Sequence, residues 1–215
     1  MATLTEPSIG APPPINPIFP GRGGGNNDGG PDPASTGVSA RIAIYIGICA
    51  STMTFAALVS AMFVRRGLGN HDWRRLPVPP LLWWNTAALL LSSIAIDFGR
   101  RAFRAGRRPE FRVLWLTGTA LGTWFLIGQS LNWKFLADHG FYLQHNPASA
   151  FFFILTWAHA AHVIGALAAL YYVACRALFF PAIPGNRTIV DVSAIFWHFL
   201  DAMWLLLMVL FVFWS

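Results

Sequence analysis

The sequence predicts an all-α protein, a polytopic membrane bundle of five transmembrane helices. Hydrophobic residues make up 55% of the chain and charged residues only 11%, whereas a soluble domain carries about 25% charged residues. The chain holds 10 Trp and 18 Phe, and aromatic side chains anchor proteins at membrane interfaces. The apolar runs are long enough to cross a bilayer core of about 30 Å. They comprise residues 41–64, 80–98, 113–133, 148–175 and 190–214.

The first two spans follow a polar tail. Residues 1–40 are rich in Pro, Gly, Asn and Ser, so we expect a flexible tail that buries too little apolar surface to order itself. Span 41–64 ends at two arginines, and Gly47 belongs to a stripe of small residues that permits close helix approach in lipid. Span 80–98 starts with proline, which suits the first turn of a helix. Its polar pairs can bond to neighbouring helices; they are Asn85-Thr86 and Ser92-Ser93.

The last three spans show further packing and capping signals. Span 113–133 contains Gly118 and Gly122, a close-packing pair at a spacing of four. Span 148–175 follows Asn146-Pro147, a helix cap with proline in the first turn, and its small residues include Ala161 and Gly165. Span 190–214 follows a sequence that resembles a capping box, with Asp in place of Glu.

Two polar pairs stand near mid-span in the fourth and fifth predicted helices. His159 and His162 share one helical face, as do His198 and Asp201. One charged group at the bilayer centre costs about 2.5 to 3.5 kcal/mol, so such groups tend to pair with one another. We therefore expect a structural polar clasp between the two helices. A proton or ion relay and a metal or haem site remain alternatives, although the first three spans contain no histidine. We assign no catalytic residue and no metal ligand.

The distribution of basic residues predicts the orientation of the chain. The side that holds the tail, the second connection and the fourth connection has ten Lys and Arg residues, and the other side has five. The positive-inside rule places the N-terminus in the cytoplasm and the C-terminus outside. Arg176 and Arg187 then become candidate contacts for lipid headgroups. The net charge of +6 is explained by orientation and lipid, and we expect no nucleic-acid partner.

Several motifs together resemble a known family. The fourth span has His159-x-x-His162-Val163-x-Gly165, and the fifth has Phe196-Trp197-His198-Phe199-x-Asp201-x-x-Trp204. With Gly128-Gln129 in the third span, these motifs are similar to those of subunit III of haem–copper oxidases, the cytochrome c oxidase subunit III family. The likeness extends over nearly all of residues 42–214.

The resemblance implies an accessory role in a respiratory complex. A subunit III carries no redox centre, so haems and copper are expected in partner subunits. It packs beside subunit I, with subunit II and possibly small subunits nearby, and binds phospholipid. The complex takes electrons from cytochrome c, reduces oxygen to water and pumps protons, here in a bacterial cell membrane. A subunit of a quinol oxidase or a nitric oxide reductase is an alternative. A proton-conducting or transport protein is an alternative of another class.

Two departures from the family pattern change the expected site. The commonest family form has seven helices, whereas this sequence shows five. Ser51 occupies the position where the family usually has a membrane-buried glutamate. Because that carboxylate is the usual partner of the polar groups in the last two helices, its replacement favours the structural clasp over a relay. We include Ser51 in the predicted clasp.

Overall fold

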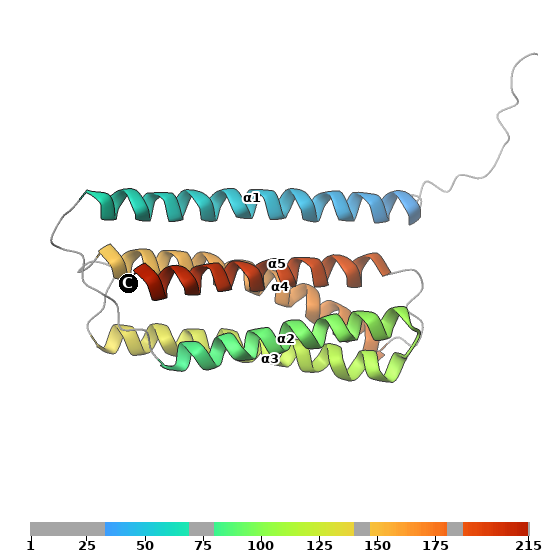
Figure 1. Ribbon diagram of the computed structural model, residues 1–215. Coiled ribbons are helices and arrows are strands. Elements are labelled where there is room, and N and C mark those ends of the chain that lie inside the picture. The colour runs from blue at the N-terminus through green and yellow to red at the C-terminus, as the bar shows by residue number, and fades with distance from the viewer. Residues whose placement is uncertain (1–32, 69–79, 140–146, 180–186, 215) are drawn as a thin grey trace, which may run out of the picture. The chain divides into compact units, whose positions relative to one another are not determined.

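Five long helices make up the described part of the molecule. The computed structural model describes residues 33–68, 80–139, 147–179 and 187–214. The helices are α1 (Pro33–Gly67), α2 (Pro80–Arg104), α3 (Arg108–Asp138), α4 (Pro147–Phe179) and α5 (Arg187–Trp214) (Figure 1). All five are long and apolar enough to cross a membrane. The predicted fold class, an all-α bundle of five transmembrane helices, is confirmed.

Consecutive helices run in opposite directions. The α2–α3 connection and the end of α4 lie at one end of the bundle, and the ends of α3 and α5 lie at the other (Figure 1). The α2–α3 turn is tight because Gly106 adopts a φ of 76°, a conformation that side chains with a Cβ rarely tolerate. Arg107 N–H donates to the Ala102 carbonyl across this turn, which satisfies one of the last carbonyls of α2.

Helix pairs of the bundle approach closely at glycines of α3. A Cβ on Gly118 would lie 2.7 Å from the Ile96 side chain on α2, and one on Gly122 would lie 2.5 Å from the Trp197 ring on α5. Lipid tails are as apolar as leucine, so transmembrane helices associate through close packing and hydrogen bonds. The two glycines therefore let α3 pack tightly against α2 and α5.

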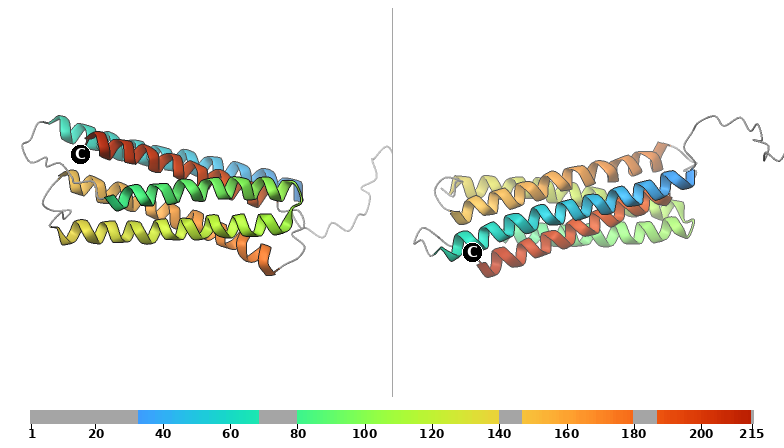
Figure 2. Two further views of the ribbon diagram at one scale, coloured as in Figure 1. Left: turned by 60° about the horizontal axis from the view of Figure 1, so that its bottom comes forward. Right: turned by 90° about the horizontal axis from the view of Figure 1, so that it is seen from above.

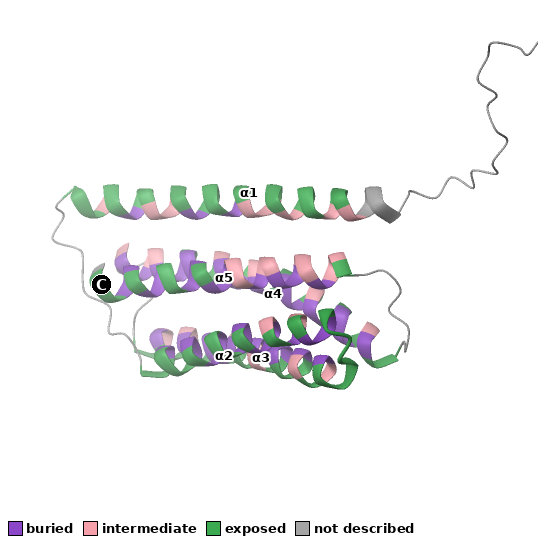
Figure 3. Ribbon diagram, turned by 45° about the vertical axis from the view of Figure 1, so that its right-hand side comes forward, coloured by how far each residue is buried: buried purple, intermediate pink, exposed green. Residues whose placement is uncertain are grey.

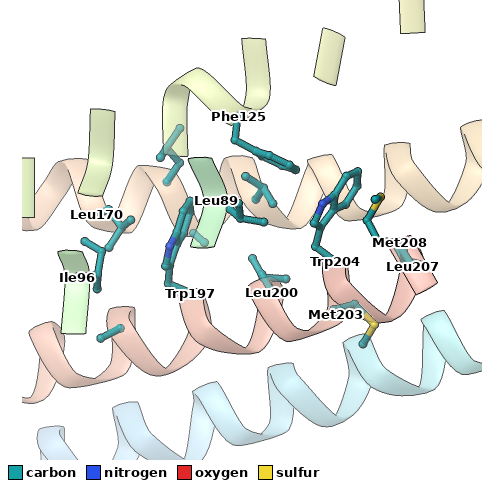
Figure 4. Close-up of a cluster of buried hydrophobic side chains, with 14 of the residues drawn as sticks. Leu89, Ile96, Phe125, Leu170, Trp197, Leu200, Met203, Trp204, Leu207 and Met208 are labelled. Atoms are coloured by element: carbon teal, nitrogen blue, oxygen red, sulfur yellow. The ribbon is translucent and has the colours of Figure 1, made fainter. Parts of the chain in front are cut away.

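Aromatic side chains of α3 and α5 fill the interior. Trp197 and Trp204 extend from α5 toward α3, and Phe125 lies beside Trp204 with the two rings edge to face and their centroids 4.9 Å apart (Figure 4). Trp115 is also fully buried, and its Nε1–H donates to the Leu170 carbonyl of α4 at 3.1 Å. Each buried indole thus adds packing area, and that of Trp115 also fixes the position of α3 against α4.

Helix α1 packs at the edge of the bundle, against α4 and α5 (Figure 2). Most of its described side chains are exposed (Figure 3). The buried ones are Ser51, Phe55 and Met62. Helix α1 begins at Pro33, about two turns before the start expected at residue 41, so its first turns fall in the predicted tail. Hydropathy marks only the lipid-facing length, while backbone hydrogen bonding continues a helix into the interface.

Candidate functional site

The interior of the bundle contains many polar side chains at membrane depth. Three groups of them are candidates for a functional role: a cluster between α2 and α5, the histidines of α4, and amides of α2 and α3. Polar groups inside a membrane protein are costly and usually contact protein or water. The buried polar residues are Ser51, Asn85, Thr86, Ser92, Ser93, Thr119, Gln129, Asn132, Ser149, Thr156, His159, Ser193 and Asp201.

Ser93 of α2 joins the two polar residues of α5. Its Oγ lies 2.6 Å from His198 Nδ1, and Asp201 lies beside it, three residues further along α5. A hydroxyl has one proton and two lone pairs. The contact with His198 is therefore satisfied either when Nδ1–H donates to Ser93 Oγ or when Ser93 O–H donates to an unprotonated Nδ1. We call Ser93, His198 and Asp201 the α2–α5 cluster.

Ion pairs continue this contact from the cluster to the end of α2. Asp191, in the first turns of α5, accepts from Arg104 at 2.7 Å and lies 3.5 Å from Arg100 Nε. Asp97 pairs with Arg101 at 2.7 Å, four residues along the same helix. The ion pair between Asp97 and Arg101 is partly exposed, so it contributes little to stability by itself. The contacts of Asp191 with Arg100 and Arg104 help to set the register of α2 against α5.

His159 of α4 lies in an aromatic enclosure. Its ring centroid is 5.1 Å from that of Trp204, 6.1 Å from Phe125 and 6.4 Å from Phe55. The side chain is 1% exposed, and neither ring nitrogen has a hydrogen-bond partner among the described residues. His162 is half-buried, with Nδ1 2.7 Å from the Ala158 carbonyl of its own helix. Its ring lies 5.6 Å from that of Phe55.

The residues of the predicted clasp thus lie in two separate places in the structure, the α2–α5 cluster and the surroundings of the α4 histidines. No hydrogen bond, ion pair or ring contact within the described ranges joins His159 or His162 to the α2–α5 cluster. Ser51 is buried on α1, one turn before Phe55, which contacts both histidines. Sequence reasoning gave Ser93 only a general helix-contact role. Ser93 lies near the middle of α2, at the same expected membrane depth as His198 and Asp201. This shared depth is the sequence feature that could have paired Ser93 with them.

The predicted packing residues also fall into two groups. Gly118 and Gly122 face neighbouring helices at close range. Around Gly47 and Gly165, in contrast, a Cβ would meet no described atom within 4 Å, and Ala161 is exposed. A helix-packing role for this second group stays a prediction.

The remaining predicted site residues lie at the end of the bundle that contains the α2–α3 turn. Arg176 is half-buried in the last turn of α4, and Arg187 is exposed at the start of α5. Lipid binding by either residue stays a prediction. In the part of the chain that the structure describes, His, Cys, Asp and Glu side chains do not gather in groups of three that could hold a metal ion.

Comparison with known proteins identifies the family. The sequence model of cytochrome c oxidase subunit III matches residues 38–215. A cytochrome c oxidase subunit 3 of Corynebacterium diphtheriae is 35% identical over 161 residues, which cover 71% of this chain and 77% of that protein. The chain belongs to the cytochrome c oxidase subunit III family. The family resemblance expected from the motifs of α4 and α5 is confirmed, and the five spans make this subunit III relative a multi-pass membrane protein.

Other members of the cytochrome c oxidase subunit III family differ in length. A probable cytochrome c oxidase subunit 3 of Nocardia farcinica is 27% identical, and the match covers 76% of this chain and 82% of that protein. A cytochrome c oxidase subunit 3 of Didelphis virginiana is 29% identical over 64% of this chain but only 47% of its own length. The match thus spans most of the Nocardia protein and about half of the Didelphis one.

Proposed function

We propose that this chain is a non-catalytic subunit of a haem–copper oxidase that packs beside subunit I in a bacterial cell membrane. The assembled complex oxidises cytochrome c, reduces oxygen to water and translocates protons. Family membership supports the assignment to an oxidase complex. The observation that carries the accessory role is the α2–α5 cluster, because the polar groups of α5 are used to hold α2.

In this proposal the α2–α5 cluster is a structural clasp. Ser93 hydrogen-bonds His198, and Asp201 lies beside this contact, so one α2 hydroxyl meets the polar face of α5. Interhelical hydrogen bonds of this kind stabilise transmembrane proteins by about 0.6 kcal/mol on average. The clasp keeps the α2–α5 pair rigid, and a rigid subunit can support the larger catalytic subunit.

The exposed face of α4 is the proposed contact with another oxidase subunit. Ala161 and Gly165 are exposed on this face and leave room for a helix backbone to approach. Small residues at that spacing are typical of close helix contacts in membranes. Gly47 of α1 offers similar space, since a Cβ there would meet no described atom within 4 Å.

Phospholipid is the proposed small-molecule ligand. An open cavity of about 270 Å³ lies between α1 and α5 and is lined only by apolar side chains, which suit an acyl chain. The lining residues are Val59, Phe63, Leu206, Val209, Leu210 and Phe213. Arg176 and Arg187, at the opposite end of α5 on the side predicted to be cytoplasmic, are proposed headgroup contacts for a second phospholipid, in the other leaflet.

Purification from native membranes tests the proposed function. A tagged chain extracted in mild detergent should bring down a large multi-helix subunit and haem absorbance, both identified in the same fraction. A second subunit with a copper ligand set would indicate cytochrome c as the donor, and other partners would indicate a quinol oxidase or a nitric oxide reductase. A colourless, solitary chain, under conditions that keep known complexes intact, would contradict the proposal.

Proton conduction is the second candidate function. Charged and polar side chains follow the α2–α5 contact from Arg104 and Asp191 to Asp201 at mid-span, and intramembrane Asp and His are common parts of proton relays. If the chain conducts protons, purified protein in liposomes gives a flux that Asp201→Asn abolishes. From the accessory role we expect no flux above that of empty liposomes.

A further inference from the structure

Three buried carboxamides of α2 and α3 lie at one level of the bundle, outside the α2–α5 cluster. Asn85, Gln129 and Asn132 are at most 1% exposed. Gln129 and Asn132 follow Phe125 by four and seven residues on α3 and therefore share its inward face. A Cβ on Gly128 would fall on the carboxamide of Asn85, so Asn85 packs directly against α3 beside Gln129.

These carboxamides have unused hydrogen-bonding capacity. None of their six oxygen and nitrogen atoms has a hydrogen-bond partner among the described residues, and the same holds for both ring nitrogens of His159. Phe125 contacts His159, with ring centroids 6.1 Å apart. The inward face of α3 that carries the carboxamides therefore faces this histidine as well.

Neighbouring hydroxyls have already donated their protons elsewhere. Thr86 donates to the Leu82 carbonyl and accepts from Trp204 Nε1. Thr156 donates to the Phe152 carbonyl and accepts from Trp133 Nε1. A buried amide without a hydrogen-bond partner is energetically costly. These four side chains, which lie along about two turns of the bundle, need a ligand that both donates and accepts.

We propose that Asn85, Gln129, Asn132 and His159 form a buried hydration site that holds ordered water between α2, α3 and α4. Water fits this chemistry because it is neutral, supplies two protons and two lone pairs, and typically makes about three hydrogen bonds when buried. Polar atoms separated by more than direct hydrogen-bonding distance are commonly bridged in this way. An ion fits less well, because three of the four side chains are neutral amides. The site is independent of the proposed membership of an oxidase complex.

Radiolytic labelling of the assembled complex tests the proposal with two buried tryptophans. X-ray pulses convert protein-bound water to hydroxyl radicals that oxidise adjacent side chains. Trp204 contacts His159 and Phe125, whereas Trp115 donates to a backbone carbonyl. Both indoles are 0% exposed. After equilibration in heavy-oxygen water, mass spectrometry should find the label several-fold enriched at Trp204 over Trp115.

Two variants test whether the water that produces the label is bound by the carboxamides. Gln129→Met combined with Asn132→Leu removes two amides and should abolish most of the Trp204 label. Ser130→Ala is the matched control, because Ser130 is exposed next to Gln129 and bonds only its own helix backbone; it should leave the label unchanged. Equal labelling of Trp204 and Trp115, or label at neither, would overturn the proposal. Full label in the double variant would overturn it too.

Discussion

Ser93 shows how much one small side chain contributes at the residue scale. It is buried on α2, and it contacts both His198 and Asp201 of α5. Removing the hydroxyl leaves the His198 imidazole in the membrane without its hydrogen-bond partner on α2. The loss of stability therefore includes the free-energy penalty of burying a polar group that no longer has a hydrogen-bond partner.

The first prediction concerns this hydroxyl. Ser93→Ala should lower the free energy of unfolding by about 0.6 to 1.7 kcal/mol, the range found for hydrogen bonds between transmembrane helices. Unfolding by sodium dodecyl sulfate in mixed micelles, followed by tryptophan fluorescence, measures the change. Ser130→Ala is the control, since that hydroxyl is exposed and bonds the Leu126 carbonyl of its own helix. Equal effects of the two variants would argue against the clasp.

Sequence reasoning found the polar residues of α4 and α5 but paired them differently from the structure. Helical spacing shows that His198 and Asp201 share a face, and their depth shows that they lie at mid-span. It does not show which neighbouring helix that face meets. Ser93 provides the contact because α2, and not α4, lies against this face of α5. The aromatic enclosure of His159 likewise depends on Phe55, Phe125 and Trp204, which come from three other helices.

Helix α3 is the element in which glycine position decides packing. Gly122 faces the Trp197 ring at a distance that excludes a methyl group, and Leu167 of α4 lies 3.2 Å from the same point. Gly165 of α4 faces no described atom within 4 Å. The sequence marked both glycines as packing residues, but only tertiary structure shows which of them meets a neighbouring helix within the chain.

The second prediction compares these two glycines. Gly122→Ala should destabilise the chain by about 1 to 3 kcal/mol, because an added methyl group forces a rigid indole to move. Gly165→Ala should leave the stability of the isolated chain nearly unchanged. Unfolding in mixed micelles measures both variants. A Gly165→Ala chain that is stable alone but fails to co-purify with haem would support the proposed contact of α4 with another subunit.

At the scale of the whole molecule, hydropathy was sufficient to predict the five-helix bundle. Each apolar run coincides with a helix, because backbone groups in lipid must be hydrogen-bonded within their own segment. The helices extend beyond the predicted spans, as α3 does at Arg108–Asp138. Asn146 of the predicted cap before α4 lies outside the described residues. Orientation stays a prediction, because the fold is the same whichever end faces the cytoplasm.

The third prediction concerns that orientation. Two single-cysteine variants, Ala105→Cys and Leu68→Cys, report on the two ends of the bundle. Residue 105 lies in the α2–α3 turn, and residue 68 follows the end of α1 at the opposite end. With both native cysteines replaced by alanine, a membrane-impermeant maleimide should label residue 68 in intact cells. Residue 105 should react only in inside-out vesicles. The reverse pattern would place the N-terminus outside and overturn the orientation expected from the basic residues.

The position of α1 has a consequence for biosynthesis. It is the first described helix to leave the ribosome, yet among the described helices its contacts are with α4 and α5, the last two to be made. Domains synthesised from the N-terminus generally fold as their segments emerge, but this helix must wait in the bilayer until translation is almost complete. During that interval its exposed surface is accessible to insertion factors and to other subunits. Ribosome stalling before α5 should therefore leave α1 open to crosslinking.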